Sequence, residues 1–263
     1  MRAIVLAAGQ GKRLMPLTTS EPKCLLPVDG DRPSLEIQLH AIANCGIERA
    51  AILIGFGADR VEHFIDTHPV PGLTVDCLYN PFYATTDNLI TCWLARHMMT
   101  EDFLLLNGDT LFVDDVLQTV LDGPHAPITV TINHKSEYDE DDMKVTLDAD
   151  GRLRAIGKKL PLSATDAESI GMLLFRESGV AAWRDALERT VRHPDALNKW
   201  YLSVVNTLAQ TMLVKTTSIT GMWWQEIDSR DDLDAARASF RRQDDEKLPV
   251  SVAAPASSRA SSL

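Results

Sequence analysis

One stretch decides the fold: Leu6-Ala7-Ala8-Gly9-Gln10-Gly11-Lys12-Arg13-Leu14-Met15-Pro16-Leu17-Thr18, followed by Pro22-Lys23-Cys24-Leu25. It comes directly after an apolar run, Arg2 to Ala8, of the kind that forms a buried parallel strand. The two glycines end this strand and let backbone N–H groups approach anionic oxygens, while Lys12, Arg13 and Lys23 add positive charge. Because open α/β sheets bind ligands beyond the carboxyl ends of their strands, the stretch predicts an anion-binding loop.

Two familiar glycine loops do not fit this stretch. A dinucleotide-binding fingerprint requires glycine where Leu14 stands, and a Walker A loop requires serine or threonine where Arg13 stands. Every fixed position of a third signature, L-A-A-G-x-G-x-R-x-x-P-x-T-x-x-x-P-K-x-L, is present. On these residues the chain resembles the nucleotidyltransferase superfamily, which makes nucleotide sugars and related activated head groups.

The resemblance implies a Mg²⁺-dependent transfer of a nucleoside monophosphate, with pyrophosphate as the leaving group. Asp109, in Asn107-Gly108-Asp109 after the apolar run Phe103 to Leu106, is implied as the first metal residue, and Asp228 as the second. The alternative for Asp228 is a helix N-cap. The expected catalytic residues are Arg13, Lys23 and Asp109. The expected nucleotide-binding residues are Leu6, Ala7, Ala8, Gly9, Gln10, Gly11, Lys12, Arg13, Lys23, Asn80, Thr86, Asn88 and Gly108.

Strands and helices alternate from the first residue, which favours an α/β fold. We expect a Rossmann-like three-layer α/β/α arrangement whose sheet is mixed and mostly parallel. Expected strands are 2–8, 50–55, 73–79, 103–106, 128–133, 143–148, 153–156 and 214–219; expected helices are 34–45, 60–67, 89–99, 180–192, 200–211 and 231–242. Strands within roughly 128–175 would form a small antiparallel extension for the acceptor. A single domain is expected over residues 1–242, and the polar segment 243–263 is expected to be a disordered tail.

The amino-acid composition limits the kinds of ligand and partner that the protein can bind. The formal net charge of −11 argues against nucleic acid as a ligand, so anions must be bound by local basic groups. The four cysteines show no C-x-x-C pair, which argues against a zinc site and fits a reducing compartment. No membrane span and no signal-peptide cleavage site are recognisable near Met1, so we expect a cytoplasmic protein, either a monomer or a homodimer.

The sequence favours CTP and a small anionic acceptor, because Asn88-Leu89-Ile90 is placed like an element of phosphocholine cytidylyltransferases. The expected acceptor contacts are Lys144, Lys158, Ser169, Tyr201 and Glu226. Phosphocholine is one candidate acceptor; the lysines, Lys159 included, point instead to a more anionic one such as a phosphonate. A sugar-1-phosphate nucleotidyltransferase using UTP, dTTP or GTP is the main alternative, although no hexapeptide repeat follows. A non-catalytic nucleotide sensor is the third.

Overall fold

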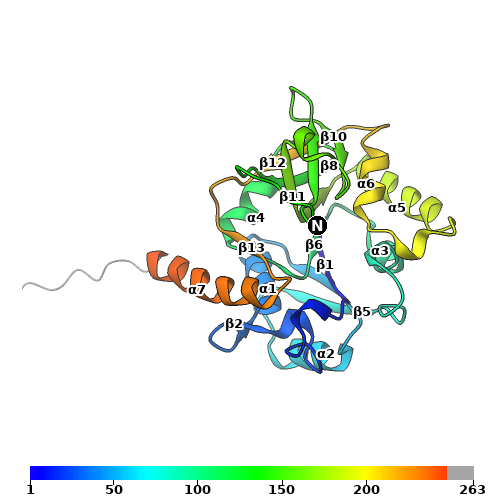
Figure 1. Cartoon of the computed structure of the whole chain (residues 1–263). Helices are drawn as coiled ribbons and strands as arrows, with labels where there is room; N and C mark the ends of the chain where they lie inside the picture. Colours follow the sequence, from blue (N-terminus) through cyan, green and yellow to red (C-terminus); the bar gives the residue numbers. More distant parts are fainter. Residues whose placement is uncertain (248–263) are drawn as a thin grey trace, which may run out of the picture.

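In residues 1–247, which the computed structural model describes, nine strands form one mixed sheet (Figure 1). Its parallel half contains β1 (Arg2–Ala7), β4 (Arg49–Ile54), β5 (Thr74–Tyr79) and β6 (Phe103–Asn107). Strand β1 lies between β4 and β6 and is parallel to both, and β5 extends the sheet beyond β4. The carboxyl ends of β1 and β6 therefore lie side by side, which places the glycine loop next to Asn107-Gly108-Asp109.

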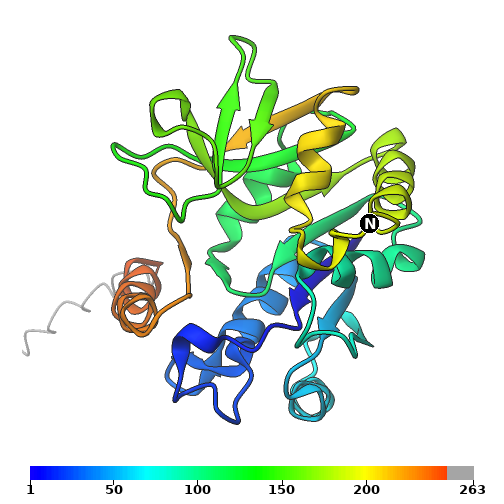
Figure 2. The same ribbon diagram turned by 45° about the vertical axis from the view of Figure 1, so that its right-hand side comes forward.

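Helices cover both faces of the sheet (Figure 2). One face packs against α1 (Ser34–Asn44), α2 (Ala58–Thr67) and α4 (Asp114–Leu121); the other packs against α3 (Asn88–Leu94), α5 (Ser178–Thr190) and α6 (Leu202–Leu208). Alternate residues of β1 divide between the two layers, since Ile4 belongs to one apolar cluster and Ala3 and Val5 to the other. Such two-sided burial explains the almost unbroken apolar character of this strand. The expected three-layer α/β/α class is confirmed.

The remaining strands form the expected antiparallel extension. They are β8 (Ile128–Asn133), β9 (Lys144–Leu147), β10 (Leu153–Ile156), β11 (Ala167–Phe175) and β12 (Val214–Ser218). Strand β11 joins the two halves, because its end at Met172–Phe175 pairs antiparallel with β6 while its start at Ala167–Glu168 pairs with β9. Strand β8 is antiparallel to β11, and β12 is parallel to β8. The extension is thus continuous with the main sheet.

Several elements escaped the sequence analysis. Helix α4 and the whole of β11 were not predicted as such, and neither were four short strands: β2 (Pro27–Asp29), β3 (Arg32–Pro33), β7 (Thr110–Phe112) and β13 (Trp224–Glu226). The described part of the chain also contains five 3₁₀ turns: η1 (Lys12–Leu14), η2 (Lys23–Leu25), η3 (Ala95–Met98), η4 (Leu162–Ala164) and η5 (Ala196–Asn198). Strands of two or three residues are too short to show a periodicity, so only tertiary pairing reveals them.

Helix α7 (Arg230–Lys247) packs Leu233, Ala236 and Phe240 against a third apolar cluster that includes Leu14 and Leu26 of the glycine-loop region. The helix continues to Lys247, so residues 243–247 are helical and the expected boundary at 242 is wrong for them. The rest of the expected tail, 248–263, lies outside the described residues. Within residues 1–247, no helix has both the length and the apolar character needed to cross a bilayer.

Candidate active site

The glycine loop leaves β1 and folds back through two 3₁₀ turns. Gly11 has a left-handed backbone with φ of 59°, a conformation that glycine adopts without strain. A Cβ atom there would also lie 3.1 Å from the Cβ of Lys23 and 3.2 Å from the Cγ2 of Thr18. The Thr18 hydroxyl donates a 2.8 Å hydrogen bond to the Gly11 carbonyl. These contacts explain why glycine and threonine stand at these two positions of the motif: they pack Lys23 against the loop.

The Asn107-Gly108-Asp109 turn is held by the end of β1 and by a buried glutamine. The Gly108 N–H donates a 3.0 Å bond to the Leu6 carbonyl, and a Cβ at Gly108 would lie only 2.7 Å from that same oxygen. From α1, Gln38 Nε2 donates to the carbonyls of Asn107 at 2.9 Å and Thr110 at 2.7 Å. Gln38 was missed by the sequence analysis, although a polar residue between Leu35 and Leu39 of an apolar helix face was an available signal.

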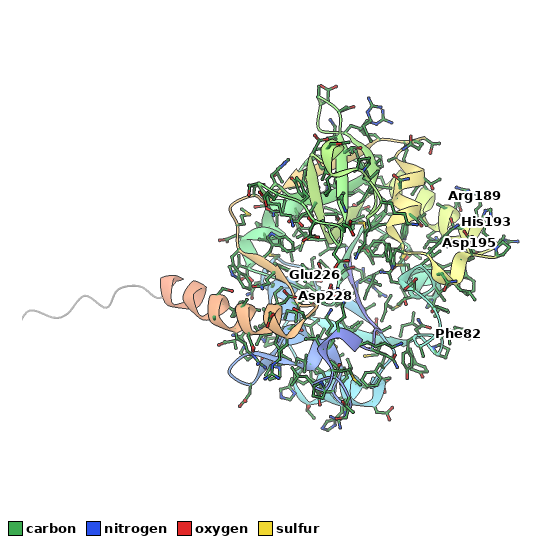
Figure 3. All side chains as sticks on the ribbon, viewed as in Figure 1. Phe82, Arg189, His193, Asp195, Glu226 and Asp228 are labelled. Carbon is green, nitrogen blue, oxygen red and sulfur yellow. The ribbon has the colours of Figure 1, made fainter. Side chains whose placement is uncertain are left out.

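Two further carboxylates reach this turn through a long-range pairing of β7 with β13. The register sets Glu226 opposite Thr110, and the Ile227 N–H donates a 2.9 Å bond to the Asp109 carbonyl. Asp228 is thereby brought beside Asp109, and Figure 3 shows Glu226 and Asp228 close together near the base of α7. The pairing thus brings together Asp109 and Asp228, the two expected metal residues, and adds Glu226, which was expected to contact the acceptor.

Asp228 is not the cap of α7. Ser229 and Asp232 form a reciprocal capping box: the Asp232 carboxylate accepts bonds from the Ser229 N–H at 2.7 Å and hydroxyl at 2.8 Å, and the Ser229 hydroxyl accepts from the Asp232 N–H at 3.2 Å. The structure therefore assigns the N-cap to Ser229, with Asp232 as its partner in the capping box. The Asp228 carboxylate is left to interact with the cations of the glycine-loop region.

Lys23 and Arg13 neutralise part of this acidic group. The Lys23 ammonium lies 2.8 Å from Asp109 Oδ2 and 2.6 Å from Asp228 Oδ1, and Arg13 lies 2.6 Å from Asp228 Oδ2. Burial alone would lower the pKa of Lys23, but the charges of Asp109 and Asp228 outweigh it and leave that pKa raised. Burial would raise the pKa of Asp228, but Lys23 and Arg13 outweigh it and leave that pKa lowered. Lys23 is therefore a cation held between two carboxylates.

The carboxylates fit a divalent cation. Asp109, Glu226 and Asp228 each offer one oxygen within 4.8 Å of the others, and oxygen ligands are those that Mg²⁺ prefers. Among the described residues, the buried Asp109 Oδ1 has no hydrogen-bond partner, so it is free to act as a ligand. Desolvation, and then the negative charges of Asp109 and Asp228, raise the pKa of Glu226 to about 8. Glu226, expected to contact the acceptor, thus lies with the two expected metal residues.

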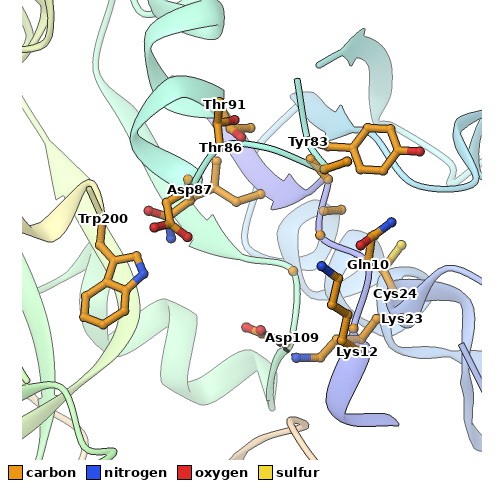
Figure 4. Close-up of a pocket in the computed structure, with 18 of the residues that line it drawn as sticks. Gln10, Lys12, Lys23, Cys24, Tyr83, Thr86, Asp87, Thr91, Asp109 and Trp200 are labelled. Atoms are coloured by element: carbon orange, nitrogen blue, oxygen red, sulfur yellow. Dashed lines mark hydrogen bonds and ion pairs between the residues drawn. The ribbon is translucent and has the colours of Figure 1, made fainter. Parts of the chain in front are cut away.

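A cleft of about 620 Å³ runs from the glycine loop to the start of α3. The expected nucleotide-binding residues line it, with the exception of Asn80. Asn80 is buried, where its Nδ2 donates to Thr91 Oγ1 at 2.9 Å and its Oδ1 accepts from the Phe82 N–H at 2.8 Å. Its side chain holds the following loop instead of contacting a ligand, so the expected contact is corrected. Figure 4 shows Lys12, Lys23 and Asp109 at one side of this nucleotide cleft, and Asp87 and Trp200 at the other.

A second cleft, of about 280 Å³, adjoins the first and shares Arg13 and Asp228 with it. Of the expected acceptor contacts, Lys158, Ser169 and Glu226 line this acceptor cleft. Lys144 does not: it is 2% exposed, and its ammonium donates to the carbonyls of Glu140, Asp142 and Lys158. Tyr201 is fully buried, and its hydroxyl donates a 3.1 Å bond to Asn107 Oδ1. Both of these expectations are corrected, because the two side chains support the walls from behind.

The outer part of the acceptor cleft is acidic. Asp139, Asp141, Asp142 and Glu168 line it, and Lys158 is the basic lining residue there, 3.7 Å from Asp141 and 5.2 Å from the centre of the Trp200 ring. Lys135 pairs with Asp142 at 2.7 Å and with Glu168 at 3.1 Å. Lys158 was expected from the sequence but Asp139 and Asp141 were not, since a polar loop such as 135–143 is ordinarily only solvated.

Comparison with known proteins identifies the family. The family model described as nucleotidyl transferase matches residues 2–177. The chain is 35% identical over 126 residues to CMP-5'-(3-aminopropyl)phosphonate synthase from Streptomyces rubellomurinus, a match that covers 48% of this chain and 20% of that protein. It is 23% identical over 257 residues to CTP:phosphoglutamine cytidylyltransferase from Campylobacter jejuni, covering 89% and 98% of the two chains. Glucose-1-phosphate thymidylyltransferase from Streptomyces antibioticus is 30% identical over 202 residues, covering 72% and 55%.

The fold also matches solved structures. The inositol-1-phosphate CTP transferase from T. maritima superposes with a TM-score of 0.77 at 22% identity, covering 94% of this chain and 97% of that one. At this identity the likeness concerns the fold alone. The family match spans the glycine loop, the Asn107-Gly108-Asp109 turn and most of the antiparallel extension. The chain belongs to the nucleotidyl transferase family.

Proposed function

We propose that this protein is a Mg²⁺-dependent cytidylyltransferase, which transfers CMP from CTP to a small acceptor carrying a phosphate or phosphonate group. The observation that carries the proposal is the meeting of two clefts at one charged centre. Arg13 and Asp228 line both clefts, and Lys23 lies between Asp109 and Asp228 at their junction. A triphosphate on one side and an anionic acceptor on the other would meet there.

The reaction needs positioning and charge neutralisation more than proton transfer. An ionised acceptor oxygen attacks the α-phosphorus, a new P–O bond forms, and the bond to the β-phosphate breaks as pyrophosphate leaves in line. Glycine-loop N–H groups and Arg13 bind the β- and γ-phosphates. Lys23 lies at the junction and stabilises the charge that develops on the α-phosphoryl group. No side chain has to act as a general base.

Asp109, Asp228 and Glu226 would hold Mg²⁺, which supplies positive charge to the α-phosphate and the leaving group. The Lys23 ammonium contacts both Asp109 and Asp228, so it lies beside the carboxylates that would hold the metal and near the phosphoryl group that would be transferred.

The names of the similar cytidylyltransferases and the charge of the acceptor cleft support the choice of acceptor. Arg13 suits an anionic group near the junction, whereas Asp139, Asp141, Asp142 and Glu168 give the outer part an acidic lining that Lys135 and Lys158 only partly neutralise. An acceptor with a phosphonate or phosphate at one end and an ammonium group at the other complements this pattern better than a neutral sugar ring does. It also suits the cleft better than the purely anionic acceptor that the lysines suggested in the sequence.

Pyrophosphate release tests the proposal. Purified protein would be assayed with CTP, UTP, dTTP, GTP and ATP in the presence and absence of Mg²⁺. The acceptors would be phosphocholine, 3-aminopropylphosphonate, propylphosphonate and glucose 1-phosphate. We expect CTP and Mg²⁺ to be required, and the aminoalkyl acceptor to exceed its matched alkyl counterpart by roughly tenfold or more in kcat/KM. Faster turnover with glucose 1-phosphate and dTTP or UTP would favour the sugar alternative, and no turnover with Mg²⁺-dependent nucleotide binding would favour a sensor.

A further inference from the structure

One charged side chain in the nucleotide cleft has no part in the chemistry described above. The far end of the cleft, away from the glycine loop, is lined by Tyr83, Ala84, Thr85, Thr86, Asp87, Asn88, Thr91, Asn198 and Trp200. Asp87 is the charged residue among these lining residues of the described chain. A lone carboxylate is an unexpected lining for a cleft whose ligand carries a triphosphate, so it requires a specific reason.

Asp87 stands at the N-cap position of α3, but its side chain does not cap that helix. The backbone around it is held on both sides: the Asp87 N–H donates a 2.8 Å bond to the Leu197 carbonyl, and the Asp87 carbonyl accepts a 3.2 Å bond from the Ile90 N–H. Within residues 1–247, the Asp87 carboxylate accepts no hydrogen bond, either from the first turn of α3 or from another described residue. Figure 4 shows Asp87 directed into the cleft opposite Trp200.

Asp87 lies at the opposite side of the cleft from the residues that are expected to bind the triphosphate. The triphosphate end of the cleft is defined by the glycine loop and by Lys12 and Lys23, which Figure 4 shows on the opposite side from Asp87. A nucleotide whose phosphates lie on the glycine loop extends its nucleoside towards the start of α3. The carboxylate is then available to a hydrogen-bond donor on that nucleoside, because an ionised carboxylate only accepts hydrogen bonds.

The bases differ in what they offer to such an acceptor. Cytosine presents an exocyclic amino group, which donates, where uracil and thymine present a carbonyl oxygen, which accepts. A carboxylate facing the amino group gains a charge-assisted hydrogen bond, whereas one facing the carbonyl oxygen meets lone-pair repulsion. The same side chain therefore attracts one pyrimidine and rejects the other.

We infer that Asp87 is a specificity-determining residue, which selects CTP over UTP and dTTP by accepting a hydrogen bond from the exocyclic amino group of cytosine. This inference rests on the proposed nucleotidyltransferase function and assigns the base preference to one side chain. The two backbone hydrogen bonds of Asp87 hold its main chain beside the cleft, so nucleotide binding has to order only the side chain.

The decisive variant is Asp87→Asn, which keeps the size and shape of the side chain. Its amide can donate as well as accept, so it should tolerate the carbonyl of uracil. We expect kcat/KM for CTP to fall by roughly 10- to 100-fold, and the CTP to UTP ratio of kcat/KM to fall by at least about tenfold. The matched control is Asp59→Asn, a solvent-exposed aspartate in the first turn of α2 outside both clefts, which should leave the ratio unchanged.

Two further measurements separate this role from others. The melting temperature of Asp87→Asn should stay within about 2 °C of the parent protein, because the carboxylate makes no hydrogen bond within the described chain and asparagine caps helices equally well. A large decrease would indicate a structural role and overturn the inference. Assays with dCTP test the other donors of the nucleoside: equal losses for CTP and UTP together with an altered CTP to dCTP ratio would assign Asp87 to the ribose and likewise overturn it.

Failure of the inference can be told from failure of the proposed function. A parent protein that releases pyrophosphate with CTP, and an Asp87→Asn variant with an unchanged CTP to UTP ratio, would refute the role of Asp87 alone. A parent protein that releases no pyrophosphate with any nucleoside triphosphate would refute the function on which the inference rests.

Discussion

The nucleotide cleft and the acceptor cleft are assembled in different ways. Most walls of the nucleotide cleft come from three short segments, 6–13, 83–91 and 108–109, which lie at or after the carboxyl ends of β1, β5 and β6 in the parallel half of the sheet. The acceptor cleft draws on the loop 139–143, the bend of β11 near Gly171, the β13 region and single residues such as Arg13 and Leu202. Parallel strands deliver neighbouring loops to one edge automatically, whereas the acceptor cleft depends on pairings between distant segments.

Because the two clefts are assembled differently, the sequence reveals the functional groups of one more readily than those of the other. A cleft built from contiguous segments leaves a motif, and the glycine loop was recognised as one. A cleft built from distant segments leaves scattered polar residues that look like solvated surface, such as Asp139 and Asp142.

The largest effect is expected for Lys23→Ala. This substitution removes the ammonium group between Asp109 and Asp228, where the transferring phosphoryl group would lie. Turnover should fall by roughly 10²- to 10³-fold, because a preorganised positive charge is lost at the reacting centre. Steady-state pyrophosphate release measures the effect. Lys159→Ala, which changes an exposed lysine outside both clefts, is the control, and near-normal turnover of Lys23→Ala would contradict the assignment.

The next effect concerns the melting temperature, for which Asp228→Asn and Asp232→Asn should respond differently to Mg²⁺. Mg²⁺ should raise the melting temperature of the parent protein, since a ligand that binds only the folded state stabilises it. Asp228→Asn should abolish most of that increase, because it removes one of the three carboxylates proposed to hold the metal. Asp232→Asn should keep the Mg²⁺ effect but lower stability by about 1 kcal/mol, since it weakens the capping box of α7. Thermal melts with and without Mg²⁺ measure both effects. If Asp232→Asn lost the Mg²⁺ effect while Asp228→Asn kept it, the two roles would be exchanged.

The smallest effect on activity is expected for Lys158, which lines the acceptor cleft, and it is compared with the effect of Lys144, which lies behind the wall of that cleft. Lys158→Ala should raise the acceptor KM by roughly tenfold and leave the nucleotide KM nearly unchanged, because Lys158 lines only the acceptor cleft. Lys144→Met should instead reduce the free energy of unfolding by about 1–3 kcal/mol, since three backbone carbonyls lose their donor. Kinetics and chemical denaturation of both variants provide the comparison. A KM effect in Lys144→Met without loss of stability would restore Lys144 as an acceptor contact.

Much of the fold could be predicted from the sequence because its parallel half follows simple local rules. Apolar runs ended by glycine or asparagine became β1, β4 and β6, and the helices between them kept their expected places within a few residues. The strand β11 was missed because it is buried on both faces and carries Glu168 and Ser169 at one end, so it shows neither an alternating pattern nor a purely apolar one. Helix α4 was missed for a related reason, since eight residues give too few turns for a clear period.

The sequence by itself determined the anion-binding loop, the layered α/β class and the acidic turn at Asp109, because these depend on residues that are neighbours along the chain. The folded chain was needed to show that Glu226 joins Asp109 and Asp228, that Ser229 and not Asp228 caps α7, and that Lys144 and Tyr201 lie behind the acceptor wall. The physical reason is that these roles depend on which partner reaches each polar group in space. A buried lysine with three carbonyl partners and an exposed lysine lining a cleft have the same letter in a sequence, and only their surroundings separate them.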